Sequence, residues 1–68
     1  MPNNDLISSL LFRFNENQIA IAAAVEELAS CVDKLGHEGV ADNVRNTLTT
    51  LDLNLEHITR GIADLMND

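Results

Sequence analysis

The stretch ADNVRNTLTTLDLNLEHITRGIADL, residues 41–65, carries the most regular pattern in the chain. Its apolar residues recur in alternating steps of four and three, which is the spacing of one face of an α-helix. Two rows make up that face: Ala41, Leu48, Leu55 and Ile62, and Val44, Leu51, Ile58 and Leu65. We therefore expect a helix over residues 40–66, with Gly39 as its N-cap. Gly61 weakens this helix by about 1 kcal/mol relative to alanine, which suggests a close contact or a frayed last turn.

The preceding segment, residues 5–35, contains neither glycine nor proline, the two strongest helix breakers. Large apolar residues recur there every seven positions, at Ile7, Phe14, Ile21, Leu28 and Leu35. We expect one long helix with this row as its core stripe. Asn4 or Asp5 can cap its start, and Gly36 can end it in a left-handed conformation.

One alternative breaks the first helix near Asn15, with Asn15 as a cap and Gln18 as its reciprocal partner. That break would produce a three-helix bundle able to exist as a monomer. The seven-residue phase nevertheless continues from Phe14 to Ile21 without a shift. A loop would normally reset the phase, so we favour the continuous helix.

The connection between the two helical segments is short, comprising Gly36, His37, Glu38 and Gly39. Helices joined by so few residues lie antiparallel and side by side. The sequence therefore predicts an all-α fold, an antiparallel two-helix hairpin over about 5–35 and 40–66. We expect residues 1–68 to form a single domain.

A lone hairpin of this sequence would leave apolar residues in water. Residues 19–25 read IAIAAAV, apolar around the whole helix, and such helices are normally buried on all sides. The residues that fall away from the core stripes are Phe12, Ile19, Ala22, Ala23 and Leu53. Exposed apolar patches usually mark interfaces, so we expect these residues to join two hairpins into a four-helix bundle.

Asn17 and Gln18 interrupt the apolar rows near the middle of the first helix. We interpret them as a polar core layer that sets the register of the bundle, as single polar residues do in coiled coils. The alternative is that they make polar contacts with a ligand or partner.

No constellation in the sequence indicates an enzyme, a metal site or a cofactor. His37 and His57 lack partners at ligand spacing, and we expect both to be solvated. Cys31 has no CxxC companion and no basic neighbour, so we expect an inert buried thiol. Phosphate-binding loops, nucleophile elbows and the HExxH zinc motif are absent.

Composition narrows the classes of partner. The chain has 68 residues, of which 46% are hydrophobic, and its formal net charge is −7. Such a charge disfavours DNA and anionic membranes, and it is compatible with a basic protein partner. One cysteine, no basic leader sequence and no apolar stretch of about 20 residues together suggest a cytoplasmic protein.

The sequence resembles two groups of known proteins. The segments FNENQIA, VEELA and VADNVR, within residues 14–48, resemble short uncharacterised bacterial helical proteins, a family that implies no activity. The length, acidity and predicted hairpin are similar to the Rop-type plasmid copy-number regulators, dimeric four-helix bundles that bind paired RNA loops. Phe14 and Gln18 match a Phe and Gln pair that contacts RNA in that family. The lysines that flank the pair there are missing here.

These observations predict a non-enzymatic helical protein–protein interaction module that acts as a homodimer. It would serve as a small adaptor, regulator or inhibitor. The alternatives are Rop-like RNA binding and mimicry of nucleic-acid charge by the acidic faces.

Overall fold

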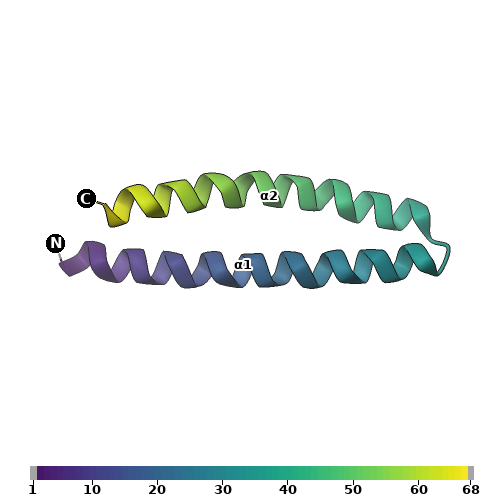
Figure 1. Cartoon of the computed structure of the whole chain (residues 1–68), viewed down its shortest axis with the longest axis horizontal. Coiled ribbons are helices and arrows are strands. Elements are labelled where there is room, and N and C mark those ends of the chain that lie inside the picture. The colour runs from purple at the N-terminus through teal and green to yellow at the C-terminus, as the bar shows by residue number, and fades with distance from the viewer. Residues whose placement is uncertain (1, 68) are drawn as a thin grey trace.

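The computed structural model describes the backbone of residues 2–67 and the side chains of residues 5–67. The chain forms two helices, α1 (Pro2–Lys34) and α2 (Glu38–Met66), which run antiparallel and bring both termini to the same end (Figure 1). The described residues contain no strand. The predicted all-α helical hairpin is confirmed.

Helix α1 is continuous through Asn15, so the three-helix alternative is wrong. The helix begins earlier than expected, because Pro2 occupies the first turn, where its missing N–H leaves no hydrogen bond unmade. Asn4 and Asp5 therefore lie inside the helix and do not cap it. Asp5 still contributes, since a negative charge in the first turn stabilises a helix N-terminus.

The glycine pattern correctly predicts that Gly36 ends the first helix, but it does not predict where the second helix begins. Gly36 adopts φ +94°, and its N–H donates to the Asp33 carbonyl at 2.9 Å, while the His37 N–H donates to the Val32 carbonyl at 3.1 Å. This pair of bonds is a Schellman motif. The N-cap of α2 is His37, which makes no side-chain capping bond. The expectation that Gly39 caps α2 is wrong, because the helix has already begun at Glu38.

The two helices meet along one row of residues from each, here called the seam. On α2 the seam is the predicted row, and all four members are buried: Ala41, Leu48, Leu55 and Ile62. On α1 it consists of small or polar residues spaced by seven, three of them buried and Ala22 partly so: Ser8, Asn15, Ala22 and Ala29. Small side chains on α1 allow the larger side chains of α2 to fill the space between the helices.

The expected core stripe of α1 is therefore wrong. Every member is exposed in the hairpin: Ile7, Phe14, Ile21, Leu28 and Leu35. Phe14 is 63% exposed and Leu28 is 64% exposed. Heptad spacing shows that these residues share a face, but a helix with apolar residues on most of its surface offers more than one face to its neighbour. Helix α2 packs against the face with the smallest side chains.

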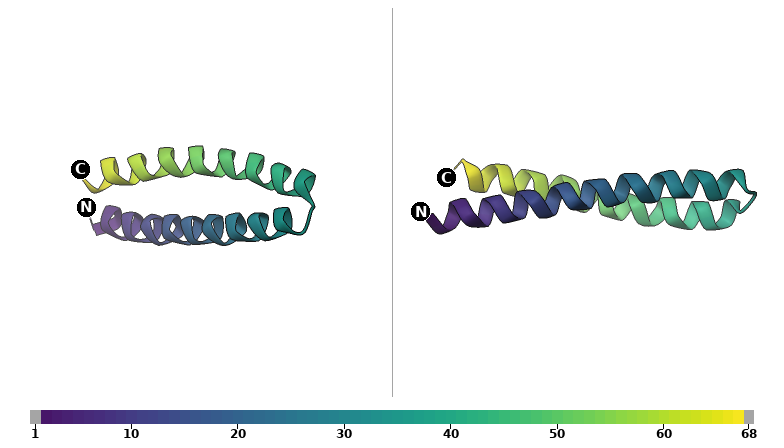
Figure 2. Two further views of the ribbon diagram at one scale, coloured as in Figure 1. Left: turned by 45° about the vertical axis from the view of Figure 1, so that its right-hand side comes forward. Right: turned by 90° about the horizontal axis from the view of Figure 1, so that it is seen from below.

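The hairpin is a thin rod that leaves much of its surface uncovered. Its extents are 53 × 15 × 11 Å, and Figure 2 shows the helices crossing each other at a shallow angle. The radius of gyration is 15.6 Å, whereas a compact chain of this length would have about 11 Å. The exposed surface is 5374 Å², whereas a compact monomer of this mass exposes about 4,250 Å². The excess is therefore about 1,100 Å².

Candidate protein-binding surface

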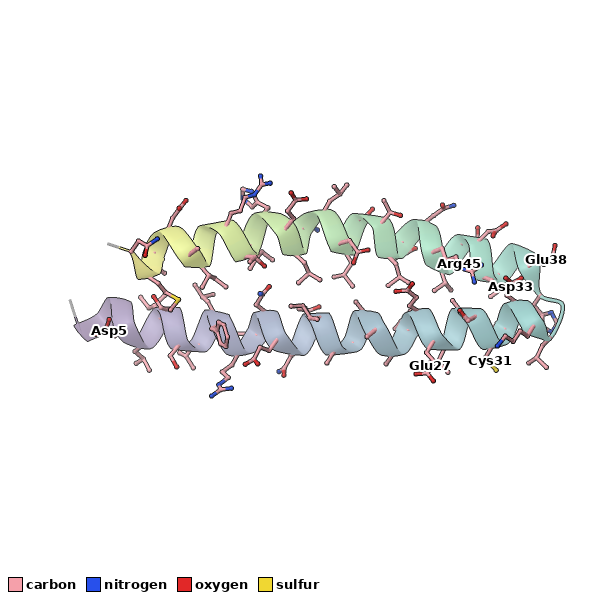
Figure 3. All side chains as sticks on the ribbon, viewed as in Figure 1. Asp5, Glu27, Cys31, Asp33, Glu38 and Arg45 are labelled. Atoms are coloured by element: carbon pink, nitrogen blue, oxygen red, sulfur yellow. The ribbon has the colours of Figure 1, made fainter. Side chains whose placement is uncertain are left out.

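The two long edges of the seam differ in chemistry. At one edge, the residues four positions after each seam residue meet across the helices. There Arg45 pairs with Asp33 at 3.2 Å, and the Thr59 Oγ1 accepts a hydrogen bond at 3.2 Å from the Nδ2 of the seam residue Asn15. Figure 3 shows Asp33 and Arg45 facing each other near the turn. This edge is the polar side of the hairpin.

At the opposite edge, the residues three positions after each seam residue flank the seam. With one exception these residues are apolar, and they are Leu11, Gln18, Val25 and Val32 on α1 and Val44, Leu51, Ile58 and Leu65 on α2. Beyond them lies the exposed row of residues that directly precede the seam residues of α1 and Gly36 of the turn: Ile7, Phe14, Ile21, Leu28 and Leu35. We call these thirteen residues the apolar face.

The apolar face carries no charged side chain among the residues that the structure describes. The charged groups lie on the polar side or on the backs of the helices, and three pairs bond to each other: Arg13–Glu16, Arg45–Asp33 and Arg60–Glu56. In a chain of net charge −7, a long charge-free strip on one side is a strong segregation. Contiguous exposed apolar surfaces of this kind usually bind another protein.

The residues expected from sequence to form the interface do not gather in one patch. Phe12 and Ile19 lie on the polar side and are exposed, Ala22 lies in the seam, and Ala23 is exposed beyond the polar side. Leu53 is 62% exposed on the back of α2. The structure thus brings Phe12, Ile19 and Ala23 to one side and leaves Leu53 apart from them.

The expected polar layer is also differently placed. Asn17 and Gln18 are both exposed in the hairpin, so they form no buried layer within one chain. The polar side chains that are buried are Ser8 and Asn15, both in the seam. Gln18 lies on the apolar face, where it is the one polar member.

The apolar face is not among the sequence-based predictions, because its α1 row at Ile7, Phe14, Ile21, Leu28 and Leu35 is the row expected in the hairpin's own core. The signal that could have revealed it is the distribution of charge. Four neighbouring heptad positions of α1, the rows that begin at Ile7, Ser8, Leu10 and Leu11, contain no charged residue anywhere between residues 7 and 35. Every acid and base of α1 falls in the remaining positions.

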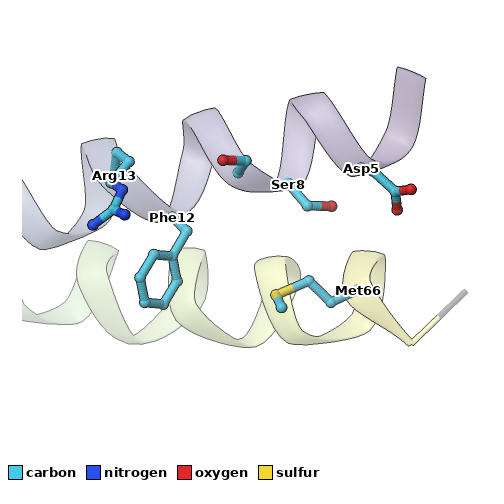
Figure 4. A pocket seen from close by; sticks show the side chains of 6 residues that line it. Asp5, Ser8, Phe12, Arg13 and Met66 are labelled. Atoms are coloured by element: carbon cyan, nitrogen blue, oxygen red, sulfur yellow. The ribbon is translucent and has the colours of Figure 1, made fainter. Parts of the chain in front are cut away.

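A shallow pocket of about 360 Å³ lies at the open end of the hairpin (Figure 4). It is lined by Asp5, Ser8, Ser9, Phe12, Arg13 and Met66. The guanidinium of Arg13 is already engaged, since it bonds to the Glu16 carboxylate at 3.0 Å.

The remaining reactive groups are solvent-exposed. Cys31 is exposed, so the expectation of a buried thiol is wrong, and Figure 3 shows it on the side of α1 away from α2. His37 and His57 are exposed, as expected. Across the described residues, no three His, Cys, Asp or Glu side chains come close enough to hold a metal ion. Neither described helix has an apolar stretch sufficient to cross a membrane.

Comparison with protein-family models, curated proteins and solved structures finds no match to this chain.

Proposed function

We propose that this chain is a non-enzymatic protein–protein interaction module that acts as a homodimer, with the apolar face as its interface. The observation that carries the proposal is the charge-free strip along one side of a strongly acidic hairpin. Two molecules of charge −7 repel each other, and that repulsion is smallest when their charged sides point apart. Association through the apolar face meets this condition.

The exposed area supports the same proposal. The hairpin exposes about 1,100 Å² more than a compact monomer of its mass. A stable interface buries about 800 Å² on each partner. An interface of that size would bring the exposed area of each chain close to that of a compact protein, and a second copy on the apolar face would convert two thin hairpins into a four-helix bundle.

The outer surface of such a dimer would carry the charged residues of a strongly acidic chain, together with the exposed Phe12, Ile19 and Leu53, which suits an adaptor, regulator or inhibitor that recruits a basic protein. A single free cysteine is compatible with a reducing compartment, so we place the dimer in the cytoplasm.

Sedimentation equilibrium of the unmodified chain over a wide concentration range tests the proposal. The chain has a mass of 7.5 kDa, and we expect twice that mass at micromolar concentration. A monomer mass at every concentration, with a cooperative thermal transition, would overturn the homodimer.

Two matched substitutions locate the interface. Ile21→Glu places a charge on the apolar face, and Leu53→Glu places the same charge on the back of α2, where the residue it replaces is similarly exposed. We expect Ile21→Glu to dissociate the dimer, and the accompanying loss of helix on dilution would be visible by circular dichroism. Leu53→Glu should leave the dimer intact. Dissociation by Leu53→Glu but not by Ile21→Glu would show that the interface lies on the back of α2.

A second candidate function is RNA binding of the Rop type. The exposure of Phe14 and Gln18 on one face of α1 favours it, because exposed aromatic and amide groups can contact bases. The absence of cations among the described residues of that face opposes it, since phosphate contacts dominate RNA affinity. A gel-shift with structured RNA at low salt separates the two candidates. A complex that is lost in both Phe14→Ala and Gln18→Ala would favour RNA binding.

A further inference from the structure

We infer that the two copies join with α1 against α1 in antiparallel orientation, so that their turns lie at opposite ends of the bundle. This inference rests on the proposed homodimer and adds its geometry. Two twofold arrangements can bring the apolar faces together. One sets α1 against α1 and α2 against α2, with the turns at opposite ends. The other sets α1 against α2, with both turns at the same end.

The exposed row on α1 is centred on the middle of the helix. Within α1 the row comprises Ile7, Phe14, Ile21 and Leu28, since Leu35 lies beyond the helix end at Lys34, and its midpoint falls between Phe14 and Ile21. The midpoint of α1 itself, Pro2–Lys34, falls at Gln18. A twofold axis through this point overlaps the two α1 helices over their full length. It also places Phe14 opposite Ile21 of the second copy, and Ile7 opposite Leu28.

The corresponding row on α2 differs in chemistry, because it includes polar side chains. The residues that directly precede its seam members are Val40, Thr47, Asn54 and Gly61. With the turns at the same end, this row would face the large apolar row of α1. Thr47 and Asn54 would then be covered by Ile, Leu and Phe, and burying polar groups without hydrogen-bond partners is unfavourable.

The antiparallel arrangement avoids this unfavourable burial. It sets the apolar row of α1 against the same row of the second copy. The polar row of α2 then faces its own equivalent, where Thr47 and Asn54 are not covered by the large apolar row of α1 and can bond to water.

Gln18 lies where the proposed twofold axis passes. It is the one polar residue of the apolar face, and it stands at the midpoint of α1. The axis brings Gln18 beside Gln18 of the second copy, and each amide can both donate and accept a hydrogen bond. Such a pair resists sliding, because any shift in register would bury an unpaired amide.

The native Cys31 provides a test without substitution, since it is the single cysteine, it is exposed, and it lies outside the apolar face. A nitroxide label on Cys31 reports the distance between the two copies by double electron–electron resonance. In the proposed arrangement the two labels lie about 27 residues apart along the bundle, which is ~40 Å at the helical rise. With the turns at the same end, the labels would lie within about 25 Å, since packed helices are separated by 8–10 Å.

A distance near 40 Å supports the inference. A short distance overturns it while leaving the homodimer intact. If no intermolecular distance is detected even at concentrations where the chain should be fully dimeric, the homodimer itself is overturned. A second label, in the double variant Cys31→Ser/Gln18→Cys, should give a short distance; a long one would displace the axis from Gln18.

Discussion

The side chain of Asn15 on α1 donates a hydrogen bond to the Thr59 hydroxyl on α2, at 3.2 Å, beside the buried Leu55 and Ile62 of the seam. Asn15 is 8% exposed, and its Oδ1 has no hydrogen-bond partner. A half-satisfied buried amide destabilises the seam, because a buried polar atom without a partner has lost its bond to water. A cavity of about 170 Å³ lined by Phe12, Asn15, Thr59, Ile62, Ala63 and Met66 adjoins it.

Replacing the amide by a hydrocarbon should therefore stabilise the protein. Asn15→Leu removes the unpaired Oδ1, and the adjoining cavity can accept the larger side chain. We expect the free energy of unfolding to rise by about 1 kcal/mol, measured by urea denaturation at fixed protein concentration. Thr59→Val is the matched control. It deprives the Asn15 Nδ2 of its acceptor, and we expect it to lower the same free energy by about 1–3 kcal/mol. A loss of stability in Asn15→Leu would contradict this explanation.

Gly61 can be replaced without a clash within the chain. It lies inside α2, and a Cβ added there would meet nothing within 4 Å. The sequence-based expectation of a close contact at Gly61 is therefore wrong within one hairpin. Alanine at this position should raise the free energy of unfolding by about 1 kcal/mol, because alanine restricts the unfolded backbone and favours the helix. A decrease would show that the added Cβ meets the facing row of the second copy in the proposed bundle.

Gly36→Ala is the natural counterpart of that substitution. A Cβ there is equally free of contacts, but the residue adopts φ +94°. A residue with a Cβ is disfavoured in this left-handed conformation by about 1–2 kcal/mol. Thermal unfolding should show Gly36→Ala less stable than the unmodified chain and Gly61→Ala more stable. Equal effects of the two would mean that the conformation of Gly36 is not required for the turn.

The ion pair between Asp33 and Arg45 joins the helices next to the turn. The two side chains are 38% and 41% exposed, so solvent screens their attraction. We expect Asp33→Asn to lower stability by less than about 1 kcal/mol, with the difference shrinking in high salt. Parallel melts at low and high salt measure it. A larger loss that persists in high salt would show that the pair acts through packing rather than charge.

Cys31 should react as an exposed thiol. We expect Ellman's reagent to modify one thiol per chain in the folded protein as fast as it does in urea, because Cys31 is exposed and lies outside the apolar face. Strong protection in the folded state, relieved by urea, would place Cys31 in an interface and would move the contact surface toward the outer side of α1.

Much of the fold follows from local patterns. The row at Leu48 and Leu55 predicts the buried side of α2, and Gly36 predicts the end of α1; both are confirmed. These features depend on periodicity and on the backbone freedom of glycine, which are properties of short segments. Helix α2 starts earlier than the sequence predicts, because His37 serves as an N-cap without a side-chain bond that the sequence could signal.

The surfaces of α1 are harder to predict. Ile7 and Phe14 belong to the strongest heptad row, yet they are exposed, whereas Ser8 and Asn15 are buried. Side-chain hydrophobicity alone would place the row of Ile7 and Phe14 in the hairpin core. The arrangement depends on how closely two backbones can approach, and that is a property of a pair of helices.

Local sequence is enough to specify two helices, the position of the turn and the buried row of α2, because helix periodicity and glycine conformation act within a few residues. The side of α1 that meets α2 is specified only when the two helices pack. Large side chains on α2 require small partners, so Ala22 and Ala29 lie in the seam. The larger apolar residues of α1 are thereby left exposed on the uncharged apolar face, the surface that we propose as the dimer interface.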